Sequence, residues 1–276
     1  MRILSRLLLL SLFNVLLLAA CRKDAKPSQA DYDAIVETQP PISKPVILKI
    51  SDAIGGYYSG LPFYYDKTSK RYPLLIFLHG GGQVGNGQID LPLLLNDGVA
   101  ELVQDKKFPP NFTVNGRNFS FITLTPQFSR YPSDADVKGF IDFAKKTFRI
   151  DTTRIYLSGL SMGGTVSANM GGEYTSELAA IAPIAGVSTG TAMKTICSNI
   201  ASGRLPVWVF HNNGDPSISV SDPINFVSTI NTFHPAIAPK LTVFNSNLHD
   251  AWTDAINPKY KENGMNMYEW MLHYNR

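Results

Sequence analysis

The sequence predicts an α/β fold, with a mostly parallel sheet covered by helices on both faces. Short apolar strands alternate with helical segments along most of the 276 residues, which is the pattern of parallel strands joined by crossover helices. One of these strands, residues 74–78, is apolar at every position, as expected of a central strand buried on both faces. Ligands of such sheets bind beyond the carboxyl ends of the strands, so residues that directly follow a strand are the candidates for a site.

The expected strands are short apolar runs bounded by turn residues. They are residues 46–50, 61–65, 74–78, 119–125, 154–158, 179–184, 207–210 and 241–244. The expected helices are residues 91–103, 134–148, a segment from 165, a helix opened by Asp222-Pro223, and residues 265–273. Apolar residues at helical spacing support the helix 134–148. Asp222 is expected as the N-cap of its helix and Pro223 as the first helical residue.

Residues 1–20 have the features of a signal peptide. Arg2 and Arg6 precede an apolar run, residues 7–20, that is shorter than the roughly 20 apolar residues of a membrane-spanning helix. The run ends in Leu-Ala-Ala-Cys at Cys21, which resembles the lipobox of bacterial lipoproteins, in which the peptide is cut before the cysteine and the thiol is acylated. We therefore expect a lipid on Cys21, and the alternative is a secreted protein in which Cys21 is incidental.

Residues 21–45 are rich in proline and charge and poor in apolar residues. They are expected to form a flexible tether ahead of a folded domain at residues 46–276. If Cys21 carries lipid, Cys197 has no partner and no intrachain disulfide supports the fold. With 44% apolar residues, a domain of this length can instead bury a large core.

The charge balance gives no sign of a nucleic-acid partner. The chain has 25 basic and 22 acidic residues, and removal of Arg2 and Arg6 with the signal peptide leaves 23 basic residues and a net charge of +1. No stretch gathers basic residues into a stripe. We therefore expect no nucleic-acid partner.

A Gly-x-Ser-x-Gly motif with Ser161 at its centre follows the strand 154–158 and precedes a helical segment. A tight strand–turn–helix junction would expose the hydroxyl of Ser161, while Gly159 and Gly163 avoid clashes with the neighbouring strand and helix. The same spacing also occurs in ordinary glycine-rich turns. The motif therefore indicates a nucleophile only if the chain also supplies a base, an acid and an oxyanion hole.

His249 is the candidate base, because a serine hydroxyl is a poor nucleophile near neutral pH without one. It follows the strand 241–244 after a short polar loop, which places it at a carboxyl edge. The other histidines precede a glycine run, an acid candidate or a proline, or lie in the last helix: His79, His211, His234 and His273. A surface loop histidine is the alternative interpretation of His249.

Asp215 is the candidate acid. It lies just after the strand 207–210, at the same edge as His249, and the alternative is a turn aspartate before Pro216. Asp222 already has a role as a helix cap, and Asp250 and Asp254 are too close in sequence to His249. The order serine, aspartate, histidine is the order of α/β-hydrolases, not that of chymotrypsin or subtilisin.

The expected oxyanion hole combines two backbone donors. Met162, the residue after the nucleophile, offers one N–H, and the glycine run after His79 offers a second, from Gly81 or Gly82. A phosphate-binding loop is the alternative for this run, but the Gly-Lys-Ser/Thr ending of such loops is missing.

Several of these segments together resemble the α/β-hydrolase esterases of the feruloyl esterase, acetyl xylan esterase and polyhydroxybutyrate depolymerase type. They are Leu78-His79-Gly80-Gly81-Gly82, Thr125-Pro126-Gln127, Gly159-Leu160-Ser161-Met162-Gly163-Gly164, Phe210-His211 through Asp215, and His249-Asp250-Ala251-Trp252. The resemblance covers residues 46–276 and implies an α/β-hydrolase fold. It departs from the pattern between His211 and Asp215, where such enzymes often have His-Gly and a shorter approach to the acid.

Substrate contacts are the least specific part of the prediction. No long insertion separates the strands, so no large lid is expected and the cleft should be open. Trp252 could stack on a sugar or aryl ring, or it could pack the loop that carries His249. Gln127, within the Thr-Pro-Gln segment of the resemblance, is the other candidate for substrate contact.

The sequence thus predicts a serine esterase that needs no metal or cofactor, in which Ser161 attacks, His249 moves the proton and Asp215 orients His249. A lipid-anchored esterase in the cell envelope, outside the cytoplasm, would by analogy remove acetyl or feruloyl groups from plant cell-wall polysaccharide. Its expected partners are a carbohydrate-linked ester and, through the lipid, a membrane. The alternatives are a peptidase of the same fold and a non-catalytic, glycan-binding lipoprotein.

Overall fold

The computed structural model describes residues 27–276. The predicted signal peptide and Cys21 lie outside the described residues. The chain divides into two units, Met1–Ile35 and Val36–Arg276. The described part of the first contains one short helix, α2 (Gln29–Asp33), capped by Ser28. Within residues 27–276, no helix combines the length and apolar character that a membrane crossing requires.

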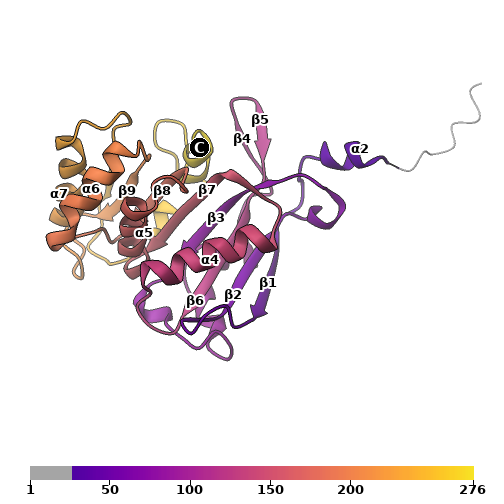
Figure 1. Cartoon of the computed structure of the whole chain (residues 1–276), viewed down its shortest axis with the longest axis horizontal. Helices are drawn as coiled ribbons and strands as arrows, with labels where there is room; N and C mark the ends of the chain where they lie inside the picture. Colours follow the sequence, from indigo (N-terminus) through magenta and orange to yellow (C-terminus); the bar gives the residue numbers. More distant parts are fainter. Residues whose placement is uncertain (1–26) are drawn as a thin grey trace, which may run out of the picture. The chain divides into compact units, whose positions relative to one another are not determined.

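A central sheet of eight strands organises the larger unit, in the order β1-β2-β6-β3-β7-β8-β9-β10 (Figure 1). The strands are β1 (Ile42–Ile47), β2 (Ile54–Leu61), β3 (Tyr72–Leu78), β6 (Ile122–Phe128), β7 (Ile150–Leu160), β8 (Ala180–Ile184), β9 (Trp208–Asn212) and β10 (Lys240–Phe244). β2 pairs antiparallel with both β1 and β6, and the remaining pairs are parallel. The prediction of a mostly parallel sheet is confirmed.

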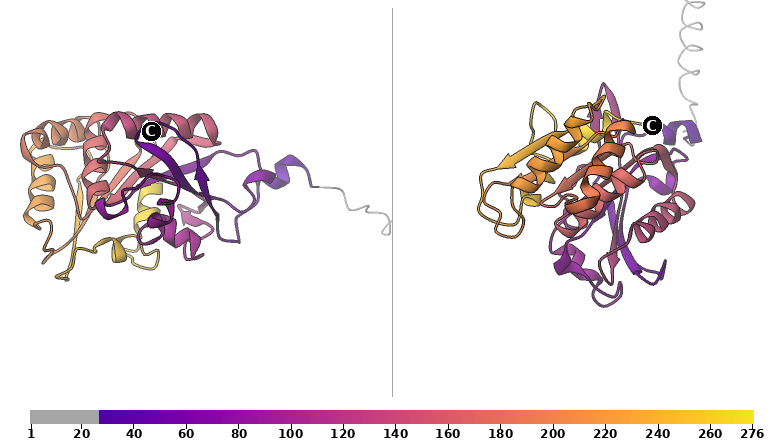
Figure 2. Two further views of the ribbon diagram at one scale, coloured as in Figure 1. Left: turned by 90° about the horizontal axis from the view of Figure 1, so that it is seen from below. Right: turned by 60° about the vertical axis from the view of Figure 1, so that its left-hand side comes forward.

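Helices cover both faces of this sheet. α4 (Asp134–Thr147), α5 (Met162–Glu173), α6 (Met193–Ser202) and α7 (Ser221–Thr232) pack together on one face and form one side of the left view of Figure 2. α3 (Val99–Gln104) and α9 (Met267–Leu272) pack on the other face, where the short α8 (Trp252–Ala255) also lies. A separate hairpin joins β4 (Phe112–Val114) to β5 (Arg117–Phe119).

The two faces have separate hydrophobic cores, and β3 divides its side chains between them. Leu74, Ile76 and Leu78 belong to the core under α4 to α7, whereas Leu75 and Phe77 belong to the core under α3 and α9. All seven residues of β3 are buried, as its continuous apolar sequence predicts. The sheet is therefore held from both sides, which fixes the carboxyl ends of its central strands.

The N-terminal part of the sheet differs from the prediction. Residues 61–65 are not a strand, because β2 ends at Leu61 and a 3₁₀ turn follows at Tyr65–Lys67. Gly55 and Gly56 interrupt the apolar pattern of β2, so the sequence does not predict this strand. A Cβ at Gly56 would lie 2.1 Å from the carbonyl oxygen of Gly87. These glycines serve a close backbone contact rather than a turn.

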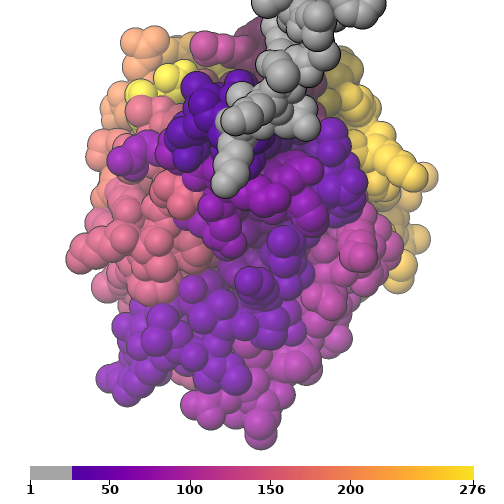
Figure 3. Space-filling view, turned by 90° about the vertical axis from the view of Figure 1, so that its right-hand side faces the viewer, coloured from indigo at the N-terminus to yellow at the C-terminus, as the bar shows by residue number. Residues whose placement is uncertain are grey.

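The expected domain start at residue 46 is also late. The larger unit begins at Val36, and Glu37 is 1% exposed and accepts hydrogen bonds from the backbone N–H of Tyr64. β1 starts at Ile42 and pairs with β2. β1 is an edge strand with several exposed side chains, and the early residues in violet form much of the surface seen in Figure 3. Residues 42–45 belong to this exposed edge strand, which explains why they resemble a tether in composition.

Two predicted helices have different limits. The helix expected at residues 91–103 is split into a 3₁₀ turn, Leu91–Leu95, and α3, because Gly98 has φ +106°. α7 begins at Ser221, so Asp222 lies in the first turn and is not the cap residue. A carboxylate in the first turn still interacts favourably with the helix dipole.

Candidate active site

Ser161 lies at the junction of β7 and α5, in the strained backbone conformation expected of a nucleophile. Its φ and ψ angles are +51° and −113°, a region that residues with a side chain rarely adopt. Its N–H donates to the carbonyl of Ile184 at 2.8 Å and its carbonyl accepts from Thr165 at 3.1 Å. The strain is therefore held by bonds to β8 and α5, and the hydroxyl is left for other partners.

Glycines on either side allow this junction to form. A Cβ at Gly159 would lie 2.6 Å from the backbone of Gly163, and a Cβ at Gly163 would lie 2.1 Å from the carbonyl oxygen of Leu78. Both distances are far below van der Waals contact. The expectation that both glycines avoid clashes with strand and helix is confirmed.

The structure brings Ser161, His249 and Asp215 together in one hydrogen-bonded chain. His249 Nε2 lies 2.9 Å from Ser161 Oγ, and His249 Nδ1 lies 2.7 Å from Asp215 Oδ2. Because a carboxylate only accepts, Nδ1 carries the proton and Nε2 has a free lone pair that faces the hydroxyl. This tautomer is the one that a general base requires.

Asp215 is fixed by several donors at once. Its side chain is fully buried, and its Oδ1 accepts from the backbone N–H groups of Ser217 at 2.8 Å and Ile218 at 3.1 Å. Burial alone would raise the pKa of Asp215, but the hydrogen bonds from His249 and these amides outweigh it and hold the pKa below its ordinary value. The carboxylate thus stays charged beside His249 at neutral pH.

The segment from the end of β9 to Asp215, where the sequence departs from the esterase pattern, is hydrogen-bonded to the loop that contains His249. Asn212 is 1% exposed and donates to the carbonyl of Leu248 and to Asp250 Oδ1, both at 2.8 Å, on the two sides of His249. Asn213 donates to Asn245 at 2.9 Å. The residues between His211 and Asp215 therefore hold the loop that contains His249.

Three backbone N–H groups around Ser161 are free to stabilise an oxyanion. Within the described chain, no hydrogen bond occupies the amides of Gly81, Gly82 or Met162. Met162 is the first residue of α5, where helix amides point outward and the dipole favours negative charge. Gly81 and Gly82 are exposed and line the same pocket as Ser161. The amide of Gly80 is bonded to Gln83 Oε1 instead.

His79 anchors the start of the glycine loop. It is 1% exposed; its Nε2 accepts from the N–H of Phe128 at 2.9 Å, so its Nδ1 carries the proton and donates to the carbonyl of Gly80 at 2.7 Å. Burial lowers the pKa of His79 to about 4. A neutral imidazole therefore connects the end of β6 to the loop at neutral pH.

Gln127 is not placed to touch a substrate, and that prediction is wrong. The side chain is 0% exposed and bonds three points of the loop after β3: it accepts from the N–H of Gly87 at 2.8 Å and donates to the carbonyls of Gln83 at 3.0 Å and Asp90 at 2.8 Å. A side chain with no exposed atoms cannot contact substrate. Gln127 instead fixes the loop that contains Gly81 and Gly82.

Trp252, at the start of α8, forms a wall of the pocket. Its ring stands at 90° to that of His249, with 5.2 Å between centroids, and its indole N–H donates to Asp97 Oδ1 at 2.9 Å. Gln83 in turn donates to the carbonyl of Asp97 at 3.1 Å. A continuous set of contacts thus joins the glycine loop to the ring of His249.

The catalytic pocket itself has a volume of about 230 Å³. It is lined by Gly80, Gly81, Gly82, Gln83, Asn96, Asp97, Leu160, Ser161, His249 and Trp252. Among these, sequence reasoning missed Gln83, Asn96 and Asp97. The sequence holds no local signal for them, because their positions depend on how the loop after β3 folds back on itself and on α8.

No family model matches the sequence. The chain is 32% identical over 103 residues to a bifunctional acetylxylan esterase/xylanase of Neocallimastix patriciarum, a match that spans 34% of this chain and 14% of that protein. Among solved structures, a thermostable esterase is similar with a TM-score of 0.56 and 21% identity, over 86% of this chain and 64% of that one. A mutant of the feruloyl esterase module of Clostridium thermocellum, in complex with sinapinate, has a TM-score of 0.52 and 14% identity, over 83% of this chain and 87% of that one.

The chain therefore has the α/β-hydrolase fold. The order of Ser161, Asp215 and His249 along the chain, and their places after β7, β9 and β10, agree with that fold.

Proposed function

We propose that this chain is a serine carboxylic-ester hydrolase that works through an acyl-enzyme. The observation that carries the proposal is the hydrogen-bonded chain from Ser161 through His249 to Asp215, beside a pocket that contains unoccupied backbone amides. A nucleophile, a base in the correct tautomer and oxyanion donors together are the requirements of acyl transfer.

In the proposed reaction, Ser161 Oγ attacks the ester carbonyl while His249 Nε2 takes its proton. The negative oxygen of the tetrahedral intermediate is stabilised by the N–H of Met162 and that of Gly81 or Gly82. His249 then donates the proton to the leaving alcohol, and a water activated by His249 releases the acid from Ser161. Asp215 stabilises the imidazolium in both halves of the reaction.

The substrate class we propose is an acetyl or feruloyl ester of a plant cell-wall polysaccharide. Support comes from the similarity to an acetylxylan esterase/xylanase and from the sequence resemblance to feruloyl and acetyl xylan esterases. The pocket of about 230 Å³ is smaller than the roughly 300–1,000 Å³ of typical small-molecule sites. This favours a small acyl group such as acetyl.

A panel of substrates tests this proposal. Protein lacking residues 1–21 should hydrolyse p-nitrophenyl acetate and acetylated xylan, and the panel should include methyl ferulate and a peptide anilide. Turnover of the anilide with none of the esters would favour a peptidase. Binding of xylan without turnover of any member would favour a glycan-binding protein and contradict the proposal.

We also propose that Cys21 is acylated and retains the enzyme at a membrane of the cell envelope. The support is the lipobox-like sequence at Cys21 and the apolar run before it. Replacement of Cys21 by serine should move the full chain from the membrane fraction to the soluble fraction when expressed in a bacterial host. Unchanged membrane retention of the Cys21→Ser chain would contradict the lipid anchor.

A further inference from the structure

A larger cleft adjoins the catalytic pocket. Its volume is about 670 Å³, and it shares Asn96, Asp97 and Trp252 with the pocket that contains Ser161. The indole of Trp252 and its hydrogen bond to Asp97 thus stand between the two spaces. Because the two spaces share these residues, the cleft is close enough to the catalytic pocket to hold the part of a substrate that does not fit there.

The cleft comes nearest to His249 at Trp252, whose ring lies 5.2 Å from the ring of His249, centroid to centroid. One wall of the cleft is formed by residues 252–259, shortly after His249 in the chain, and the other by residues 96–109, which include part of α3. The leaving alcohol of an ester must lie near His249, because His249 gives it a proton. The position of the cleft therefore suits the alcohol part of the substrate, whereas the acyl group lies by the oxyanion donors.

The lining of the cleft combines polar groups with apolar side chains. Glu101, Asn257 and Lys259 offer hydrogen-bond acceptors and donors, beside the apolar surfaces of Leu102 and Ile256. A sugar requires both kinds of contact, because its hydroxyl groups donate and accept while its C–H faces pack on apolar side chains.

The charges of the cleft favour a neutral ligand. Two carboxylates, Asp97 and Glu101, and two ammonium groups, Lys107 and Lys259, line the cleft, so their formal charges balance. Lys107 pairs with Asp105 at 2.8 Å and lies 3.9 Å from Glu101. Across residues 27–276, Lys259 makes no ion pair and is exposed, so its ammonium group is free for a ligand hydroxyl.

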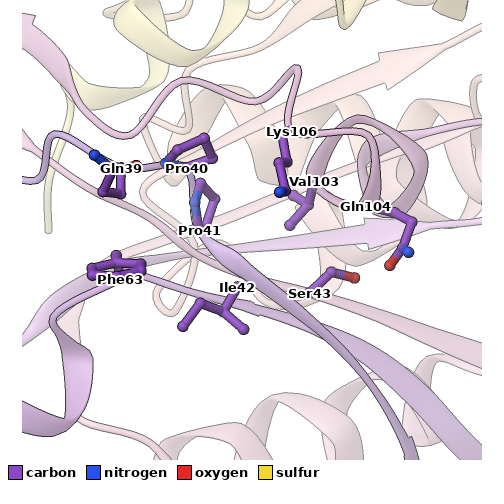
Figure 4. A pocket seen from close by; sticks show the side chains of 9 residues that line it. All are labelled: Gln39, Pro40, Pro41, Ile42, Ser43, Phe63, Val103, Gln104 and Lys106. Atoms are coloured by element: carbon purple, nitrogen blue, oxygen red, sulfur yellow. The ribbon is translucent and has the colours of Figure 1, made fainter.

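A second cavity provides a contrast. It has a volume of about 360 Å³, begins at the residues before β1 and is lined by nine residues, among them Pro40, Pro41 and Phe63 (Figure 4). Lys106 is its one charged lining residue, and none of its residues lines the catalytic pocket. Lys106 therefore offers a matched control for Lys259.

We propose that the cleft beside Trp252 binds a neutral sugar of the alcohol part of a carbohydrate ester, with Glu101, Asn257 and Lys259 as its specificity-determining residues. The assignment rests on the proposed esterase function. It predicts that the enzyme discriminates among esters mainly by the sugar that carries the acyl group.

Steady-state kinetics on two substrates test the cleft. Glu101→Gln and Lys259→Gln should raise KM for an acetylated xylo-oligosaccharide about tenfold more than KM for p-nitrophenyl acetate, which has no sugar. Lys106→Gln should leave both KM values unchanged. In the wild type, unacetylated xylo-oligosaccharide should inhibit p-nitrophenyl acetate hydrolysis competitively, and more weakly in the Lys259→Gln variant.

Equal changes in KM for both substrates would overturn the sugar assignment, as would the absence of inhibition by xylo-oligosaccharide in an enzyme that hydrolyses p-nitrophenyl acetate. A stronger preference for an oligosaccharide with a uronic acid near the acetyl group would overturn the assignment of a neutral ligand. Failure of the proposed esterase function would give a different result. In that case the wild-type chain would hydrolyse neither the acetylated xylo-oligosaccharide nor p-nitrophenyl acetate.

Discussion

Two glycine-rich segments meet at Ser161, and their glycines serve different ends. In the elbow, Gly159 and Gly163 are required by the protein's own backbone, since a Cβ at either would lie 2.6 Å or less from main-chain atoms. In the loop after β3, a Cβ at Gly81 or Gly82 would meet no atom within 4 Å. Gly159 and Gly163 are therefore needed for folding, whereas Gly81 and Gly82 leave space and free backbone amides beside Ser161.

The two segments also differ in how they are held in place. The elbow is fixed by close packing between β7, α5 and β3. The loop has little regular structure and is tied by buried side chains, chiefly His79, Gln83 and Gln127. Substitutions in the elbow should thus mainly lower the free energy of unfolding. Substitutions in the loop should also lower the rate of ester hydrolysis.

The largest effect is expected for Gly163→Ala. The added Cβ would lie 2.1 Å from the carbonyl oxygen of Leu78. This oxygen belongs to the backbone of β3, so the clash is removed only if β3 itself moves. We expect a loss of at least about 3 kcal/mol in the free energy of unfolding, measured by urea denaturation. Gly139→Ala is the control, because Gly139 is exposed within α4 with open space around it, and it should gain about 0.5–1 kcal/mol. Equal stability of the two variants would contradict the role of Gly163.

Gln127→Leu should weaken the loop. It removes the partner of three loop groups, the N–H of Gly87 and the carbonyls of Gln83 and Asp90. Gly87 and Gln83 are buried and stay unsatisfied, at about 1–2 kcal/mol each, whereas the partly exposed Asp90 can bond water. We expect a loss of about 2–4 kcal/mol in unfolding free energy and a lower kcat for p-nitrophenyl acetate. Gln88→Leu, in the same loop but exposed, should change neither quantity. Normal kcat in Gln127→Leu would show that the loop needs no such support.

His79 should make stability depend on pH. Its pKa is lowered to about 4 in the folded chain, so the unfolded chain binds more protons between pH 4 and 6.5. Stability from this group is therefore fully present above pH 6.5 and is lost as the pH falls to about 4, by about 3 kcal/mol in total. Urea denaturation from pH 4 to 7 should show this slope in the wild type and a shallower one in His79→Gln. The same slope in both would exclude His79 as its source.

The smallest change in stability is expected for Gly81→Ala. A Cβ there enters open space, so unfolding free energy should change by less than about 0.5 kcal/mol. The same Cβ narrows the catalytic pocket, so kcat/KM for p-nitrophenyl butyrate should fall about tenfold more than kcat/KM for p-nitrophenyl acetate. A variant as unstable as Gly163→Ala would remove the distinction between the two glycine segments.

Much of the site could be predicted because its parts end strands in a parallel sheet. Ser161, Asp215 and His249 follow β7, β9 and β10, and such positions converge whatever the details of the loops. The motif around Ser161 is local, so its spacing is visible in the sequence. The central strands are predictable because their signal is also local: a continuous apolar run such as β3 indicates a strand that is buried on both faces.

Contacts between distant loops could not be predicted. Asp97 and Trp252 are 155 residues apart in the chain, and Gln127 reaches loop residues 37 to 44 positions away. Both depend on tertiary packing that no local pattern encodes. The sequence therefore predicts the wrong role for Gln127. It also gives no strand signal for β2, because Gly55 and Gly56 allow a close contact with the backbone of residues 86 and 87, and this contact is not visible in the sequence of β2 itself.

Covalent labelling tests the central claim, that Ser161 is the nucleophile, most directly. The wild-type chain should react with a fluorophosphonate, gain one adduct on the peptide that contains Ser161, and lose p-nitrophenyl acetate hydrolysis in proportion to the adduct. Ser161→Ala should gain no adduct and lose roughly 10⁴-fold or more of kcat. An adduct on another residue that accompanies full inactivation, or a Ser161→Ala variant that still turns over the ester, would contradict the account.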